Sequence, residues 1–161
     1  MGKPTIRLDR VDRRLLAALQ NDATRSQAEL AELSGMSRSS CARRIREFES
    51  AGLIEAQVAV LNPSMAGFNI EVQLAVAMME HSDENRRSFE LHVGRLDAVT
   101  ECFSVSGERD YVLHVVVPDM DAYTEFLNTS ILAHPAVRSA SSTFVLRRVK
   151  YTTSLPLDTL D

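Results

Sequence analysis

The chain has 161 residues, a length that fits one domain or two small ones. Its hydrophobic fraction of 45% and charged fraction of 25% are ordinary for a globular protein. No apolar run approaches the ~20 residues that a membrane-spanning helix needs. The net charge of −4 argues against nucleic-acid binding by the chain as a whole. Residues 1–50, however, hold ten Lys/Arg and seven Asp/Glu, so they carry +3 and the remainder carries −7. This asymmetry predicts that only the N-terminal part meets an anionic partner.

The sequence shows no feature of a secreted protein, a metalloprotein or an enzyme. A positive N-terminus without a following apolar stretch is not a secretory signal, so we predict a cytoplasmic protein that does not contact membranes. Cys41 and Cys102 lack metal-ligand spacing and are expected to be buried thiols in a reducing cytosol. The histidines lack metal spacing too, and no nucleophile motif or phosphate-binding glycine loop is present. We therefore predict no catalytic residues, no metal and no cofactor.

Residues 9–52 have the apolar periodicity of three helices separated by short turns. Leucines recur at spacings of three and four after Asp9, which is placed to cap the first helix. Ser26 and Glu29 form a capping-box pattern before a second helix, whose buried face is expected to include Leu30 and Leu33. This pattern predicts a first helix packed beside a shorter second one.

A third helix follows after a very short turn. Gly35 suits a turn that needs a positive φ, and Ser37 is placed to cap the next helix. On that helix Cys41, Ile45 and Phe48 have the spacing of a buried stripe. Two helices joined so tightly, after a preceding one, have the geometry of a helix-turn-helix that binds DNA.

The face of the third helix opposite its apolar stripe is basic and hydroxyl-rich. Arginine forks can bind guanine edges and phosphates, and serines can donate or accept at either group. The alternative is an ordinary solvated basic face, but the helix-turn-helix pattern favours double-stranded DNA as the partner. The predicted DNA-binding residues are Arg38, Ser39, Ser40, Arg43, Arg44 and Arg46.

The rest of the chain alternates strand and helix patterns. Val58, Val60 and Leu61 suggest a short strand within a linker over 56–69. The expected elements after it are strands over 70–76, 99–106, 111–117 and within 137–149, with helices over 82–95 and after Pro118. This order is the ferredoxin-like βαββαβ arrangement. The fold class is therefore α+β, with a three-helix helix-turn-helix domain at 1–55, the linker at 56–69 and a ferredoxin-like domain at 70–161.

Such a sheet carries both helices on one face, which leaves the other face to be buried by a partner. We therefore expect a homodimer.

Several motifs in order resemble the Lrp/AsnC family of leucine-responsive and asparagine-synthesis regulators, also called feast/famine regulators. The resemblance runs from about Leu8 to Tyr151. Its motifs are Leu8–Arg13, Ser37–Ile45, Gly52–Ile54, Leu61–Pro63, Val105–Tyr111 and Val117–Met120. The resemblance implies a transcriptional regulator with a winged-helix-like or plain helix-turn-helix. It also implies that dimers pair through their sheets and assemble further, to a tetramer or octamer.

The resemblance also implies a small effector, most often an amino acid, bound between dimers near the turn after the second strand. Carried over by position, the effector residues are Ser104, Val105, Gly107, Arg109, Asp110, Met120, Thr143, Phe144 and Val145. A carboxylate such as Asp110 can pair with an α-ammonium, and turn amides near Gly107 can receive an α-carboxylate.

Two positions depart from the family pattern. Glu108-Arg109 stands where an acidic residue usually precedes an aromatic or apolar one, so Arg109 is expected to alter the charge preference for the effector, unless it merely pairs with Glu101 or Glu108. Ser104 is more polar than the leucine-responsive branch would suggest, and leucine is not predicted.

Two other classes of function are kept as alternatives. Siroheme decarboxylases are similar to this family in both domains, and here only His114 could serve as a pocket histidine. The second alternative is an architectural, chromatin-like protein that covers DNA without an effector.

Overall fold

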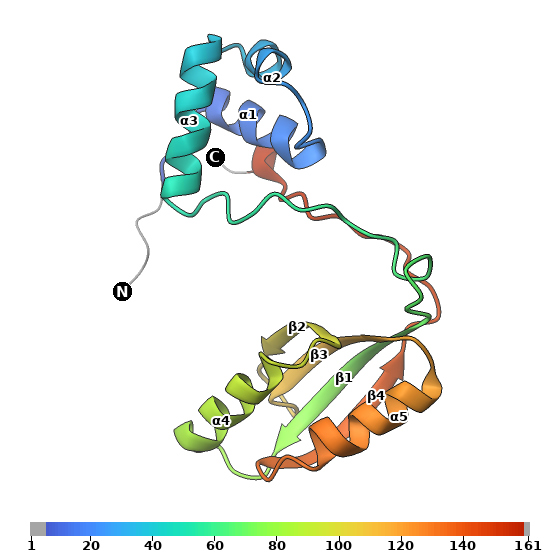
Figure 1. Ribbon diagram of the computed structural model, residues 1–161. Helices are drawn as coiled ribbons and strands as arrows, with labels where there is room; N and C mark the ends of the chain where they lie inside the picture. Colours follow the sequence, from blue (N-terminus) through green and yellow to red (C-terminus); the bar gives the residue numbers. More distant parts are fainter. Residues whose placement is uncertain (1–5, 160–161) are drawn as a thin grey trace. The chain divides into compact units, whose positions relative to one another are not determined.

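The computed structural model describes residues 6–159, which divide into two compact units (Figure 1). The described residues up to Ala59 group with those from Lys150 onward, and Val60–Val149 form the second unit. The sequence prediction placed all of 70–161 in one domain. The C-terminal segment differs because the Leu155 amide donates to the Gln20 side chain at 2.7 Å, and Leu157 packs against the core of the first unit.

The first unit contains the three predicted helices, α1 (Arg10–Asn21), α2 (Gln27–Ser34) and α3 (Arg38–Ser50). Each has the predicted N-cap. Asp9 accepts from two backbone amides of α1, and Ser26 and Glu29 form a reciprocal capping box on α2. Ser37 accepts from the Ser40 amide at the start of α3. These side chains bind the orphan amides of each first turn and so fix where each helix begins.

The three helices bury one small core. Its fully or nearly fully buried members are Leu15, Leu16, Leu30, Ala31, Cys41 and Phe48. The prediction for Leu33 was wrong, because its side chain is 49% exposed. Helix α2 has only eight residues, and its buried positions are Leu30, Ala31 and Ser34, so Leu33 lies outside the buried stripe.

The turn between α2 and α3 explains their close spacing. Gly35 has φ +81°, a left-handed conformation that favours glycine, and its amide donates to the Ala31 carbonyl at 2.9 Å. Within the described residues of this unit no strand follows α3, so the unit is a helix-turn-helix without a β-wing. The predicted strand at Val58–Leu61 is also wrong: both these end residues are exposed, and no strand among residues 6–159 pairs with the segment.

The second unit confirms the ferredoxin-like order of strands and helices. Its elements are β1 (Ile70–Met78), α4 (Asp83–Val93), β2 (Val99–Ser104), β3 (Tyr111–Val117), α5 (Met120–Phe126) and β4 (Val137–Phe144). A π-helical segment, Leu127–Leu132, continues α5. All neighbouring strands pair antiparallel in the order β2-β3-β1-β4, with β1 and β3 at the centre.

One face of this sheet is covered and the other is open. Val72, Leu74 and Leu113 share a single buried cluster with Phe89 of α4 and Phe126 of α5, so both helices lie on the same face (Figure 1). Alternate strand residues point away from this cluster. An open sheet face of this kind is the feature from which a homodimer was predicted.

The predictions about membrane spans, metal sites and cysteines can be compared with the structure. Within residues 6–159 no helix is long and apolar enough to cross a membrane. The same residues contain no cluster of three or more His, Cys, Asp or Glu that could hold a metal ion. Both cysteines are unpaired, but the prediction of two buried thiols was wrong for Cys102, which is exposed on the edge strand β2.

Candidate DNA-binding surface and effector site

Helix α3 presents a basic face to solvent. Arg38, Ser39, Arg43 and Arg46 are exposed, because Cys41 and Phe48 hold the opposite side of the helix in the core. No hydrogen bond or ion pair of the Arg38 or Arg46 side chain is found in the described part of the chain, so both guanidinium groups remain available to a ligand. The exposed arginines therefore form a surface suited to an anionic partner.

The serines at the start of α3 contact one another through their hydroxyl groups. The Ser37 hydroxyl lies 3.2 Å from that of Ser39 and donates to that of Ser40 at 2.9 Å. Ser40 is half-buried. These contacts stabilise the first turn of the helix, and Ser39 remains the more accessible of the two predicted serines.

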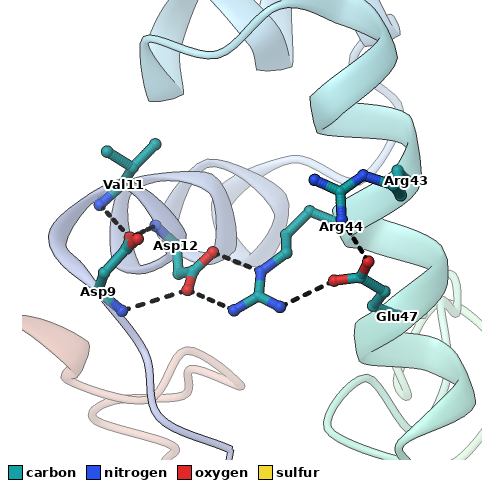
Figure 2. Close-up of polar contacts among 6 residues, drawn as sticks. All are labelled: Asp9, Val11, Asp12, Arg43, Arg44 and Glu47. Carbon is teal, nitrogen blue, oxygen red and sulfur yellow. Dashed lines mark hydrogen bonds and ion pairs between the residues drawn. The ribbon is translucent and has the colours of Figure 1, made fainter.

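Arg44 lies in a network of charged side chains rather than on the open face (Figure 2). Its Nε and Nη2 donate to the two carboxylate oxygens of Asp12 on α1, at 2.7 and 2.6 Å. Its Nη1 donates to Glu47 at 2.8 Å, and Arg43 Nη1 donates to the other oxygen of Glu47 at 2.6 Å. Of the six predicted DNA-binding residues, Arg44 alone is tied to another helix by these contacts.

The network sets the charge states of its members. Hydrogen bonds from Arg44 lower the pKa of Asp12, although burial opposes them. Hydrogen bonds to Asp12 and Glu47 raise the pKa of Arg44 above its already high ordinary value. The hydrogen bond from Arg44 also lowers the pKa of Glu47. All three groups are therefore charged at neutral pH.

The sequence analysis did not identify Asp12 or Glu47 as parts of this surface. Glu47 was detectable, since it follows Arg43 by four residues and Arg44 by three, which are the spacings of neighbours on one helix face. Asp12 was not, because 32 residues separate it from Arg44 and only the packing of α1 on α3 joins them.

The predicted effector residues fall into two groups at opposite ends of the sheet. Ser104, Val105, Gly107, Arg109 and Asp110 lie in the β2–β3 hairpin, and Met120, Thr143, Phe144 and Val145 lie at the other end. The pairing of both groups with β1 gives the distance between them. Tyr111, next to Asp110, pairs with Val76, whereas Phe144 pairs with Val72. Four residues along a strand span about 13 Å, so one protomer does not bring the two groups together.

The hairpin is held against the end of β1 by Asp110. Its Oδ2 accepts from the Met78 amide at 2.8 Å, its amide donates to the Val76 carbonyl at 2.9 Å, and its carbonyl accepts from the Val105 amide at 2.9 Å. The other carboxylate oxygen lies 3.0 Å from Nδ1 of His81, which the sequence analysis did not identify. Asp110 is therefore already engaged by the protein, and an α-ammonium group would have to compete with His81 for it.

Arg109 and Gly107 complete this end of the sheet. Arg109 is half-buried and donates to the Ser139 hydroxyl at 3.3 Å, and no ion pair with Glu101 or Glu108 is found in the described part of the chain. Gly107 has φ +120°, a conformation that favours glycine. A half-buried guanidinium with one neutral partner is available to a carboxylate.

The second group lies near the start of α5. Met120 is exposed, as is Thr143, and the Val145 amide donates to the Glu71 carbonyl at 2.9 Å. The Phe144 ring packs edge-on against Tyr123, with ring centroids 5.2 Å apart. This group offers mainly apolar surface.

Comparison with known protein families agrees with both units. Residues 8–55 match the family of winged helix-turn-helix DNA-binding domains, and residues 71–155 match the Lrp/AsnC ligand-binding domain. The chain belongs to the Lrp/AsnC family. The resemblance stated from the motifs is thereby confirmed, and so is the α+β fold with its helix-turn-helix. The protein is an Lrp/AsnC DNA-binding transcriptional regulator with a ligand-binding domain.

Curated relatives cover nearly the whole chain. The DNA-binding transcriptional activator DecR of Escherichia coli K12 is 34% identical over 151 residues, which is 94% of this chain and 99% of that protein. The leucine-responsive regulatory protein of Salmonella typhimurium is 33% identical over 157 residues, covering 98% and 96%. These relatives are transcriptional regulators and not enzymes, which supports the prediction against an enzyme over the siroheme decarboxylase alternative.

Solved structures extend the comparison to ligands. A transcriptional regulator of Neisseria meningitidis in complex with L-methionine has a TM-score of 0.89 and 34% identity, covering 94% of this Lrp/AsnC regulator and 98% of that chain. A feast or famine regulatory protein of Mycobacterium tuberculosis, also complexed with L-methionine, has a TM-score of 0.85 and 29% identity, covering 92% and 99%.

Proposed function

We propose that this regulator binds specific DNA sequences through α3 as a cytoplasmic homo-oligomer, and that an amino acid or related metabolite alters this binding. The observation that carries the DNA-binding assignment is the exposed arginine face of a capped recognition helix, formed by Arg38, Arg43 and Arg46. Two-fold symmetric dimers favour pseudo-palindromic sites with half-sites about 34 Å apart, or a multiple of this distance.

The oligomer provides a way to complete the effector site. The hairpin group and the Met120 group are separated within one protomer, and a site between dimers would take one group from each side. Regulators of this family bind L-methionine in two of the similar structures, which supports an amino acid as the class of effector. Dimers associated into a tetramer or octamer would place such sites at their contacts.

The test is a mobility-shift assay on the DNA upstream of the regulator's own gene, with and without each of the twenty amino acids. A specific shift that one amino acid changes would support the proposal and name the effector. A specific shift unaffected by all twenty would contradict the amino-acid assignment but keep the DNA-binding one. Genome-wide selection of bound fragments separates a local regulator, with few narrow sites, from an architectural protein, which would cover DNA broadly and refute sequence specificity.

Arg43 is expected to contribute directly to operator affinity. Replacing a bidentate arginine that contacts a base edge costs about 1–3 kcal/mol, so Arg43→Ala should weaken operator binding by that amount. Fluorescence anisotropy at fixed salt measures the change. Arg87→Ala, which removes an exposed arginine from α4 of the sheet unit, serves as the control and should leave affinity unchanged. An unaltered affinity of Arg43→Ala would remove this residue from the contact surface.

Arg109 is expected to set the charge preference for the effector. Its guanidinium has one neutral partner, so we expect dicarboxylic amino acids to be favoured over their amides, and Arg109→Gln to reverse this order. Isothermal titration of aspartate, glutamate, asparagine and glutamine into both proteins measures the preference. Equal affinities for acids and amides in the unaltered protein would show that Arg109 does not contact the effector side chain.

A further inference from the structure

Three of the five N–H donors of Arg44 are engaged within the protein. Two of them form a fork on Asp12, at 2.7 and 2.6 Å, and a third binds Glu47. The guanidinium carbon also lies 4.7 Å from the ring centroid of Phe48. The side chain of Arg44 is thus held by a carboxylate of another helix, a carboxylate of its own helix and a buried ring, as Figure 2 shows for the two carboxylates.

Moving Arg44 to DNA would leave a buried charge behind. The Asp12 side chain is only 3% exposed, and among residues 6–159 its one hydrogen bond besides those from Arg44 comes from the Asp9 amide at 3.2 Å. A buried carboxylate that loses its cationic partner is strongly destabilised. Arg43, whose side chain is 65% exposed, loses only a surface ion pair when it leaves Glu47. The two neighbouring arginines therefore differ sharply in the cost of reaching DNA.

We propose that Arg44 is a positioning residue for DNA binding rather than a DNA contact, and that Asp12 acts on DNA affinity through it. The fork from α3 to α1 fixes the rotation of α3 about its axis. Because neighbouring residues on a helix are 100° apart, the same rotation directs Arg43 and Arg46 away from α1 and toward the ligand. This assignment rests on the proposed binding of DNA through α3, and it removes Arg44 from the six contacts predicted from sequence.

The change in DNA affinity expected on neutralising Asp12 is opposite to the change that charge repulsion alone would produce. Neutralising a carboxylate near DNA ordinarily strengthens binding, because phosphates repel it. If Asp12 positions the recognition helix, Asp12→Asn weakens binding instead. We expect a loss of about tenfold, the lower end of what loss of a partner that orients a ligand costs at metal sites. Glu32→Gln is the matched control, an exposed acidic residue of the same unit, and should leave affinity unchanged or slightly raised.

The experiment uses the full chain and a duplex selected by the protein from a random library. Fluorescence anisotropy gives Kd, and titration at high protein concentration gives the fraction of active protein. Circular dichroism at the assay temperature verifies folding. A positioning role raises Kd in a variant whose circular dichroism and active fraction match those of the unaltered protein, whereas reversible unfolding raises Kd only in proportion to the loss of folded protein that circular dichroism detects. Tighter binding by Asp12→Asn would overturn the proposal.

If Asp12→Asn does not fold, variants of Arg44 itself test whether this residue positions α3 or contacts DNA. Lysine supplies a point charge to phosphate but cannot form the fork, so Arg44→Lys should lose about tenfold in affinity, like Asp12→Asn. Arg44→Gln should leave the slope of log K against log salt unchanged. Full affinity of Arg44→Lys, together with a slope reduced by about 0.9 in Arg44→Gln, would assign Arg44 to a phosphate contact and refute the proposal.

Discussion

Phe48→Ala is expected to abolish DNA binding while the sheet unit stays folded. Phe48 is fully buried at the centre of the helical core, and truncating a buried phenylalanine to alanine costs about 3–5 kcal/mol. This core is small, so such a loss is a large part of its stability. The sheet unit has a separate core around Leu74 and Phe89 and should be unaffected.

Chemical denaturation followed by far-UV circular dichroism, alongside DNA binding and effector binding, measures this result. Phe48→Ala should lower the denaturant concentration at which the helical unit unfolds and abolish DNA binding, while effector binding is retained. Phe89→Ala, the equivalent truncation in the other core, should lower the denaturant concentration at which the sheet unit unfolds. Leu33→Ala removes an exposed leucine from the helical unit and should change stability by less than about 1 kcal/mol. Loss of both transitions in Phe48→Ala would show that the two cores do not unfold independently.

Much of the fold was predictable because local rules determined it. The caps at Asp9, Ser26 and Ser37 follow from side chains that satisfy nearby backbone amides, and Gly35 from the left-handed turn it permits. Alternation along β1 predicted a strand with one buried face. These signals lie within a few residues of their effect, so the sequence contains them directly.

The predictions that were wrong concern residues whose surroundings come from elsewhere in the chain. Val58–Leu61 has the apolar pattern of a strand, but a strand needs a hydrogen-bonded partner strand, and none is found for this segment among residues 6–159. The C-terminal segment from Lys150 has no periodic signal, and its contacts with Gln20 and the packing of Leu157 on the helical core place it with the helices. Long-range packing decided both cases.

The candidate sites also combine features set by local sequence with contacts set by long-range packing. The basic face of α3 followed from helical periodicity, because Arg43 and Arg46 lie opposite the apolar stripe. The pairing of Arg44 with Asp12, and of Asp110 with His81, joins residues about 30 positions apart, which no local pattern reveals. The sequence therefore predicted where charge gathers, whereas the structure shows which charges are already paired within the chain.

The pairing of Asp12 with Arg44 should make the helical unit sensitive to acid. Hydrogen bonds from Arg44 lower the folded-state pKa of Asp12 below the value of about 3.9 that it has when unfolded. The stabilisation is therefore present above pH 4 and is lost as the pH falls through the folded-state value. Breaking a buried pair costs about 3–5 kcal/mol, and because the Arg44 side chain is 27% exposed we expect about 2–3 kcal/mol here.

Comparison with Asp12→Asn isolates this contribution, since asparagine resembles the protonated carboxyl in shape and charge. At pH 7 the variant should be less stable than the unaltered protein by about 2–3 kcal/mol, and the difference should shrink progressively below about pH 5 and approach zero only near pH 1. Urea denaturation at fixed ionic strength and protein concentration gives both free energies of unfolding.

The sheet unit provides the internal control. Burial raises the pKa of Glu71, but hydrogen bonds from His114 and Arg148 outweigh it and lower the pKa overall, so this unit should lose stability in acid equally in both proteins. A difference between the two proteins that stays constant from pH 7 to pH 3 would mean that the Asp12 charge does not stabilise the helical unit.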